Sequence, residues 1–161
     1  MAGMSNRVLA VILGATIASA TPTWVHAQSG RGVEAPLDTV RFAAALDVDL
    51  TASKRVVRGL YSRDFIVGTG RLATRGDELT VRYTGALADG RGFTGAAEPP
   101  ATFKLGAGTV IDGWDRGLSG MRVGGRRQLI IAPDLGYGGK QAGSIPPNSV
   151  LVFEVELLAV R

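Results

Sequence analysis

The chain has 161 residues, of which 45% are hydrophobic and 20% charged, a composition typical of a soluble globular domain with an appendage. It has no cysteine, and its one histidine, His26, lies in a segment that we expect to be removed. Disulfides, a Ser-His-Asp triad and the usual zinc sites are therefore excluded, which leaves carboxylate metal sites or catalysis without proton transfer. The formal net charge of +4 is spread along the chain with no basic run longer than Arg126-Arg127, which argues against nucleic acid as a partner.

The first 27 residues have the pattern of an export signal. A short basic segment, 1–7, precedes the apolar run 8–20, which is too short to span a bilayer comfortably. Pro22 breaks the segment, and Ala27 is the small residue expected before a cleavage site. We therefore expect cleavage after Ala27, export, a periplasmic location if the source is Gram-negative, and no membrane attachment afterwards. An uncleaved segment that tethers the chain to the membrane, or a buried N-terminal helix, is the alternative.

Residues 28–57 form an N-terminal extension or linker in this interpretation. Its first part, 28–36, contains glycine, serine and proline and favours a mobile chain. Residues 37–46 could form a short helix with an apolar face. A docking arm, a dimerisation element and a plain linker all remain open, with the linker as the default.

From Lys54 onward the hydrophobic pattern changes to the two-residue period of β-strands, and many of the 23 glycines separate the apolar runs as turns. We expect strands at 55–61, 63–67, 78–86, 102–105, 126–132 and 150–160. Asp89-Gly90 is a hairpin signal, because glycine tolerates the positive φ of a tight turn. The last strand alternates apolar and acidic residues, so one face should be buried and the other mostly exposed.

One helix is predicted within this β region. The residues with near-helical spacing are Val110, Ile111, Trp114, Leu118 and Met121, with Gly120 as the expected end. Gly113 and Gly117 each lower the intrinsic helix stability by about 1 kcal/mol, so we expect the helix to form because a sheet packs over it. The predicted fold class is α+β, with an antiparallel β-sheet of about five or six strands curled around one short α-helix.

Six runs in the second half of the chain resemble the motifs of one family, in that family's order. They are 81–85 (VRYTG), 89–93 (DGRGF), 110–114 (VIDGW), 132–138 (APDLGYG), 145–148 (IPPN) and 151–157 (LVFEVEL). Through them residues 58–161 resemble an FKBP-type peptidyl-prolyl cis/trans isomerase domain of the exported bacterial type. The resemblance implies a strongly twisted antiparallel sheet wrapped around one short helix, in agreement with the periodicity. It also implies an isomerase with an apolar active-site hollow that needs neither cofactor nor metal.

The resemblance also assigns site residues, position by position. The catalytic set would be Tyr83, Phe93, Ile111, Trp114, Tyr137 and Phe153, and the substrate-binding set Val110, Ile145, Thr94 and Ala101. Trp114 would form the floor, and the Ile111 backbone N–H and the Tyr137 hydroxyl would donate hydrogen bonds to peptide carbonyls. Any single aromatic residue in such a protein is more often only core, but these rings come from separate predicted elements, which favours a pocket. We expect Phe65 and Phe103 in the core or at the rim.

The chain departs from the family pattern at three places. Thr94 stands where the family usually has Asp, and Ala101 where another pocket aromatic is common. The loop between Tyr137 and Ile145 is about one residue shorter than in the best-known members. These departures predict a reduced affinity for macrolide inhibitors.

Two weaker signals have ordinary explanations. Residues 68–73 match the dinucleotide-binding pattern G-x-G-x-x-A, but strand-like residues follow where a helix should begin, so we expect a turn. Asp112 and Asp115 could suggest a carboxylate metal site, yet on a short helix we expect them to act as dipole partners and solvent contacts.

Three functions are compatible with this sequence. The first is an exported prolyl isomerase acting on proline-containing unfolded or partly folded polypeptides. The second is a proline-peptide-binding chaperone or interaction module with weak or no catalysis. The third is a membrane-tethered accessory domain whose 28–57 arm docks to a partner.

Overall fold

The computed structural model of the chain describes residues 36–94 and 99–161. The expected signal peptide, 1–27, and the start of the extension lie outside the described residues. Within the described part, no helix has the length and apolar character needed to cross a membrane.

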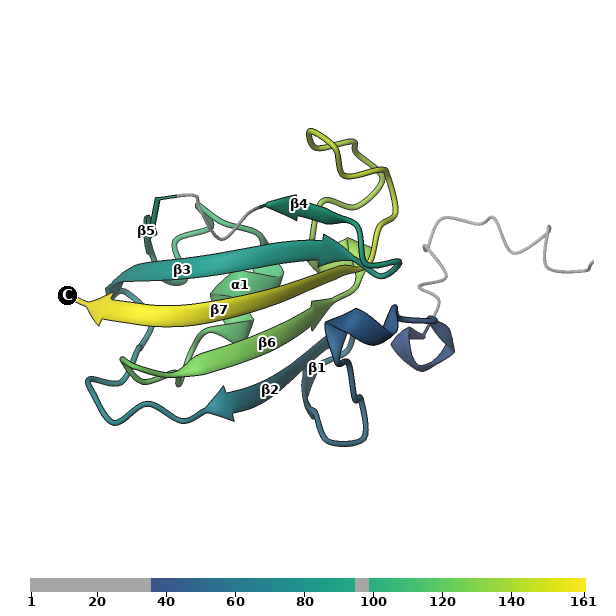
Figure 1. Ribbon diagram of the computed structural model, residues 1–161. Helices are drawn as coiled ribbons and strands as arrows, with labels where there is room; N and C mark the ends of the chain where they lie inside the picture. The colour runs from purple at the N-terminus through teal and green to yellow at the C-terminus, as the bar shows by residue number, and fades with distance from the viewer. Residues whose placement is uncertain (1–35, 95–98) are drawn as a thin grey trace, which may run out of the picture. The chain divides into compact units, whose positions relative to one another are not determined.

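A seven-stranded antiparallel sheet forms the framework of the described residues (Figure 1). Its strands are β1 (Lys54–Val57), β2 (Leu60–Ile66), β3 (Glu78–Leu87), β4 (Gly92–Thr94), β5 (Ala101–Lys104), β6 (Arg126–Ile131) and β7 (Leu151–Val160). In space they follow the order β1-β2-β6-β7-β3-β4, and β5 also pairs with β3. The predicted antiparallel sheet around one short helix is confirmed, with seven strands instead of five or six.

The boundary between the first two strands differs most from the sequence prediction. The turn between β1 and β2 falls at residues 58 and 59, where Gly59 has a φ of 77°, and not near residue 62. The long run of β-forming residues hid this turn, and the sheet begins at Lys54, ahead of the expected domain start at residue 58. The Asp89-Gly90 hairpin is present and leads into β4, which has only three residues and is too short for a periodicity to appear.

The helix α1 (Asp112–Gly117) is shorter than the apolar spacing predicted. Ile111 precedes it with an extended backbone, and the chain turns away after Leu118. Asp115 accepts hydrogen bonds from the backbone N–H groups of Gly106 and Gly108, at 2.8 and 2.9 Å, so it fixes the preceding loop rather than contacting solvent alone. The helix is thus held in place by tertiary contacts as well as by its apolar face.

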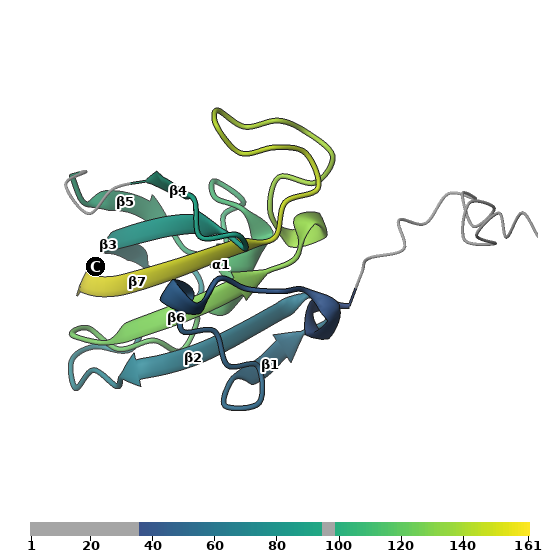
Figure 2. The same ribbon diagram turned by 45° about the vertical axis from the view of Figure 1, so that its right-hand side comes forward.

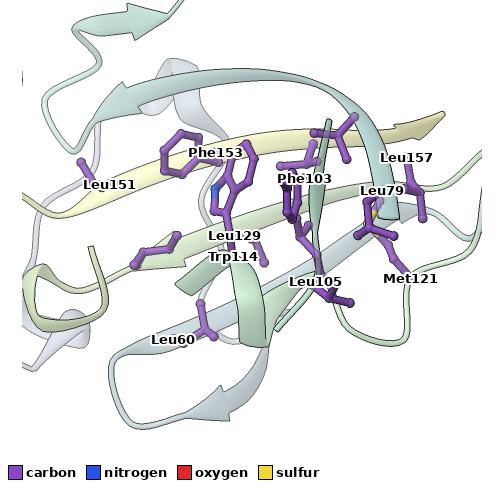
Figure 3. Packing of buried hydrophobic residues seen from close by; sticks show 14 of the residues in the cluster. Leu60, Leu79, Phe103, Leu105, Trp114, Met121, Leu129, Leu151, Phe153 and Leu157 are labelled. Carbon is purple, nitrogen blue, oxygen red and sulfur yellow. The ribbon is translucent and has the colours of Figure 1, made fainter. Parts of the chain in front are cut away.

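The main core lies between α1 and the face of the sheet that curls around it (Figure 3). The side chains of Leu129 and Ile131 point from β6 into this core, and both are completely buried. A Cβ atom on Gly113 would lie 2.6 Å from Ile131 Cγ2, and one on Gly117 would lie 2.7 Å from Leu129 Cδ2. The two glycines that weaken the helix by propensity therefore allow it to lie close against β6.

Residues 37–50 cover the other face of the sheet (Figure 2). The possible helix over 37–46 is replaced by two short 3-10 helices, η2 (Leu37–Thr39) and η3 (Ala44–Leu46). Leu37 packs with Ile130 of β6 and with Ala132, which directly follows β6. These two residues alternate along the chain with Leu129 and Ile131, which belong to the main core. The buried Gln128 side chain donates a hydrogen bond from Nε2 to the Leu46 carbonyl at 2.7 Å. This part of the extension therefore belongs to the packed structure.

Candidate functional site

One cavity of about 800 Å³ opens beside α1, and every residue predicted for the site lines it. From strands and helix come Tyr83, Phe93, Thr94, Ala101, Trp114 and Phe153, and from loops come Val110, Ile111, Tyr137 and Ile145. The structure therefore brings together residues that lie up to 70 positions apart in the chain, from Tyr83 to Phe153. Their roles in binding or catalysis remain predictions.

Aromatic rings from four elements, α1, β3, β4 and β7, pack against one another and line the cavity. The Trp114 ring centroid lies 4.8 Å from that of Tyr83 and 5.3 Å from that of Phe153, with interplanar angles of 87° and 80°. Phe93 meets Phe153 in the same edge-to-face manner at 5.4 Å. Figure 3 shows Trp114 between Phe153 and Phe103. Because edge-to-face pairs are the favoured arrangement of aromatic rings, these contacts fix the ring positions.

The aromatic wall depends on the absence of a side chain at Gly85. This residue lies in β3, opposite Thr94 of β4 and Phe153 of β7. A Cβ atom there would lie 2.7 Å from Phe93 Cζ and 2.8 Å from Phe153 Cε1, closer than such atoms approach in proteins. Glycine at this position therefore gives the two rings the space in which they meet.

Polar groups that could bind a ligand lie among the aromatic rings of the cavity. The indole Nε1 of Trp114 and the Oγ1 of Thr94 are buried and have no hydrogen-bond partner within residues 36–94 and 99–161. The Ile111 backbone N–H donates to no group among the described residues, whereas its carbonyl accepts from Trp114 and Asp115 at the start of α1. Tyr137 is 40% exposed at the rim. A ligand with carbonyl groups could therefore be bound by these donors beside the aromatic rings.

The hairpin between β3 and β4 positions Phe93 and Thr94. The Asp89 carboxylate accepts hydrogen bonds from the Arg91 backbone N–H at 3.0 Å and from the Arg91 side chain at 2.8 Å. The backbone bond and then the side-chain bond hold the pKa of Asp89 below its usual value. Gly90 supplies the positive φ of 90° that the turn needs.

Several lining residues were not in the predicted site. They are Thr102, Phe103, Lys104, Thr109, Ala142, Gly143 and Ser144. Phe103, expected in the core or at the rim, is 9% exposed. It belongs to the core, where it packs against Trp114, and it also borders the cavity. No sequence signal marked 142–144, whose position depends on a small bridge between Ala142 and Ile145. Phe65, the other residue expected in the core or at the rim, lies outside the cavity and has Arg63 and Arg126 over its ring.

The two weaker sequence signals have structural roles. Within residues 68–73, Leu72 bridges to Arg122 and Ala73 donates to the Met121 carbonyl, so this segment is a turn region and no helix follows it. Asp112 lies 3.8 Å from Arg116 on the exposed side of α1. No group of three or more His, Asp and Glu side chains that could hold a metal ion occurs in the described ranges.

Comparison with known proteins gives a consistent result. Residues 69–158 match the family described as FKBP-type peptidyl-prolyl cis-trans isomerase. An FK506-binding protein of Neisseria meningitidis serogroup B is 48% identical over 105 residues, which are 63% of this chain and 96% of that protein. FK506-binding protein 4 of Neurospora crassa is 46% identical over 112 residues, or 69% of this chain, but the chain spans only 24% of that longer relative.

Two solved structures are similar in fold as well as in sequence. The crystal structure of FkpA from Escherichia coli has a TM-score of 0.62 and 38% identity, over 68% of this chain and 52% of FkpA. The crystal structure of AtFKBP13 has a TM-score of 0.62 and 35% identity, over 71% of this chain and all of the other.

Proposed function

The chain belongs to the FKBP-type peptidyl-prolyl cis-trans isomerase family, and from this premise we propose that it accelerates rotation about X-Pro bonds in exported proteins. The family predicted from the six motifs is thereby confirmed. Our proposal adds to this family assignment a role for the cavity, a class of substrates and a cellular location.

The barrier to be lowered arises from amide resonance. Rotation about a peptide bond is opposed by about 18–20 kcal/mol, and the uncatalysed X-Pro bond isomerises over roughly tens to hundreds of seconds. In the twisted transition state the carbonyl loses charge and the nitrogen becomes pyramidal. An apolar cavity therefore disfavours the planar, more polar ground state relative to the twisted state, without any acid or base.

The chain offers groups suited to this mechanism. In our proposal the prolyl ring lies on the indole of Trp114, with Tyr83 and Phe153 beside it. The Ile111 backbone N–H and the Tyr137 hydroxyl donate hydrogen bonds to peptide carbonyls, while Val110 and Ile145 exclude water. A thousand- to millionfold acceleration requires about 4–8 kcal/mol, which desolvation and two hydrogen bonds can supply.

The observation that carries the proposal is the convergence of aromatic rings on one open cavity. Tyr83, Trp114 and Phe153 come from β3, α1 and β7, lie within 6.2 Å of one another by ring centroid, and border about 800 Å³ of space. If the rings served only to fill a core, no cavity would open beside them. An aromatic cavity with two available hydrogen-bond donors is what a prolyl segment requires.

The substrates and location follow from the sequence. We propose that the partners are proline-containing unfolded or partly folded polypeptides, met after export and cleavage of residues 1–27. Macrolides would bind with reduced affinity, since Thr94 lacks a carboxylate and Ala101 lacks a ring. Similarity to bacterial relatives and to FkpA is compatible with export. Sequencing the mature N-terminus from fractionated cells tests this: an intact Met1 in the membrane fraction supports the tethered alternative.

A second candidate is a proline-peptide-binding chaperone that retains the cavity with little catalysis. Thr94 favours it, because a buried hydroxyl with no partner in the described part of the chain stands where the family usually has a carboxylate. Binding of a prolyl peptide in calorimetry, without acceleration of its isomerisation, would support this candidate.

A protease-coupled assay with a proline peptide tests the leading proposal. We expect residues 28–161 to accelerate isomerisation well above the background rate, and a rate equal to background would reject the enzyme. Phe93→Leu, in the cavity, should lower kcat/KM by about tenfold through lost apolar contact. The matched variant Phe42→Leu, also partly buried but on the other face of the sheet, should leave kcat/KM unchanged.

A further inference from the structure

Residues 37–50 touch the β3–β4 hairpin, which carries Phe93 into the lining of the cavity (Figure 1). The backbone N–H of Ala43 donates a hydrogen bond to the Ala88 carbonyl, in the turn of this hairpin, at 2.8 Å. In the described part of the chain it is the one backbone hydrogen bond between the extension and the hairpin. A segment expected to be a linker therefore contacts an element of the candidate site.

The Ala43 side chain packs closely against the same turn. A Cβ atom added at Gly90 would lie 3.0 Å from Ala43 Cβ, tighter than most Cβ contacts in proteins. Gly90 also has a φ of 90°, so the turn needs glycine both for its backbone and for this close approach. The contact between extension and hairpin thus combines a hydrogen bond with close packing at one residue.

Little of β4 is paired within the sheet. It has three residues, lies at the end of the strand order and pairs with β3 at two positions, with a register shift between them. Local bonds from Gly90 to the Leu87 carbonyl and from Leu87 to the Arg91 carbonyl fix the shape of the turn. A shift of this turn would carry β4 with it and move the Phe93 ring against Phe153.

The extension is itself anchored close to Ala43. The Leu46 N–H donates to the Ala43 carbonyl at 3.0 Å, and the Leu46 carbonyl accepts from the buried Gln128 side chain of β6 at 2.7 Å. Arg63 of β2 donates to the Asp47 carbonyl at 3.2 Å. Because these bonds join the extension to two interior strands, Ala43 is a fixed support for the turn.

We propose that Ala43 is a positioning residue: its backbone N–H fixes the β3–β4 hairpin, and through the hairpin the Phe93 ring that borders the substrate. The proposal rests on the proposed function, since it gives the extension a part in that reaction. Phe93 would contact the prolyl segment both before and during rotation. Loosening it should therefore weaken binding more than it slows the rotation step.

Ala43→Pro in the full chain removes the donor and places a ring carbon against the Ala88 carbonyl. Ala43 has a φ of −63° and a ψ of 138°, which a proline residue adopts without strain. We expect KM in the protease-coupled assay to rise by about three- to tenfold, with kcat within about twofold of the wild type. Amide hydrogen exchange at Gly90 should become about tenfold faster, because the turn opens more often.

Ala44→Pro, one residue later, is the matched control. Ala44 is exposed, begins η3 and donates from its backbone N–H to no backbone group among the described residues. Proline is well tolerated at the first position of a helix, and the extended backbone of Ala43 suits the residue before it. Both KM and the exchange rate at Gly90 should match the wild type. Phe42→Leu keeps the Ala43 donor as well, so it too should leave KM unchanged.

A double-mutant cycle with Phe93→Leu tests whether Ala43 acts through that ring. In the Phe93→Leu background, Ala43→Pro should raise KM by less than about twofold, because the ring that it positions is already lost. If Ala43→Pro fails to fold, Ala43→Val keeps the donor, adds bulk against Gly90 and should raise KM in the same direction. Effects that multiply in full, or a lower Tm with unchanged KM, would overturn the positioning role.

Two further readouts separate this proposal from the proposed function. Background rates for the wild type would reject the isomerase, and Kd for a prolyl peptide by calorimetry then replaces KM in the cycle. Exchange at Gly90 reports on the hairpin with no peptide present. Faster exchange in Ala43→Pro but not in Ala44→Pro would support the support of the hairpin by Ala43, whereas equal exchange in both would overturn it, whether or not the chain is an enzyme.

Discussion

At the scale of single residues, two aromatic side chains of the cavity, Trp114 and Tyr137, differ in how much they contribute to the core, because they differ in exposure. Trp114 is 6% exposed and contacts three other rings, so it supports both the core and the cavity. Tyr137 is 40% exposed at the rim and contributes little to the core. A change at Trp114 therefore mixes stability with activity, whereas a change at Tyr137 separates them.

Tyr137→Phe removes the hydroxyl that we propose donates to a peptide carbonyl. A single hydrogen bond is worth about 0.5–1.5 kcal/mol, so kcat/KM should fall about two- to tenfold with Tm unchanged. Tyr61→Phe, on the other face of the sheet, is the matched control and should not alter kcat/KM. An unchanged kcat/KM in Tyr137→Phe would remove this hydroxyl from the mechanism.

Asp77 makes the turn before β3 sensitive to acid. Its carboxylate accepts from the Thr74 backbone N–H at 2.9 Å and from the Thr74 hydroxyl at 2.8 Å, and these bonds, the backbone one first, lower its pKa. Because the folded pKa lies below the unfolded one, its stabilisation is present above the unfolded pKa of about 4 and is lost as pH falls through the folded pKa.

The expected result concerns the difference in Tm between wild type and Asp77→Asn. This difference should be largest above about pH 4 and should shrink below it, as the wild-type carboxylate becomes protonated. Thermal melts from pH 7 to pH 2 measure it, with the exposed Asp38→Asn as control. A difference that stays constant with pH would contradict the role given to the charge.

At the scale of elements, α1 depends on what surrounds it. Its six residues include two glycines, and a helix this short is not stable alone. Arg127 of β6 donates to the Gly117 carbonyl at 2.8 Å and to both carboxylate oxygens of Asp64 on β2, at 2.6 and 2.9 Å. The end of the helix is thereby bonded to Arg127 of β6, and through this side chain it is linked to Asp64 of β2. Asp115 links the helix in the same way to the loop before it, at Gly106.

Gly117→Ala tests the close contact between α1 and β6. Alanine would improve helix propensity by about 1 kcal/mol, but its Cβ would lie 2.7 Å from Leu129 Cδ2, and Leu129 is completely buried. Overpacking should dominate and destabilise the fold by about 1–3 kcal/mol in urea denaturation. Arg116→Ala, on the exposed side of the same helix, should change stability by less than about 0.5 kcal/mol. A stabilised Gly117→Ala would mean that the core relaxes easily.

At the scale of the whole described molecule, the sheet carries a separate apolar cluster on each face. The main core and the cavity share one face, and the cluster of Leu37, Ile130 and Ala132 occupies the other. Figure 2 shows the described extension and α1 on opposite sides of the sheet. Stability and activity should therefore respond separately to changes on the two faces.

Leu37→Ala tests this separation. Leu37 is 4% exposed, so its truncation should destabilise the fold by about 2–3 kcal/mol in urea denaturation, with kcat/KM within about twofold of the wild type. Leu72→Ala, at a leucine that is 39% exposed, should have little effect on stability. A stability of Leu37→Ala equal to the wild type would mean that the extension is not part of the cooperative unit.

Sequence periodicity was enough to predict the antiparallel sheet and the single helix, because alternation and turn glycines are local signals. The resemblance to the family was needed for the site, and it named part of the cavity lining but not Thr102, Lys104 or residues 142–144. The three-residue β4 and the packing of the extension were decided only by tertiary contacts, since a short strand is defined by its partner and Leu37 is buried only by a distant β6.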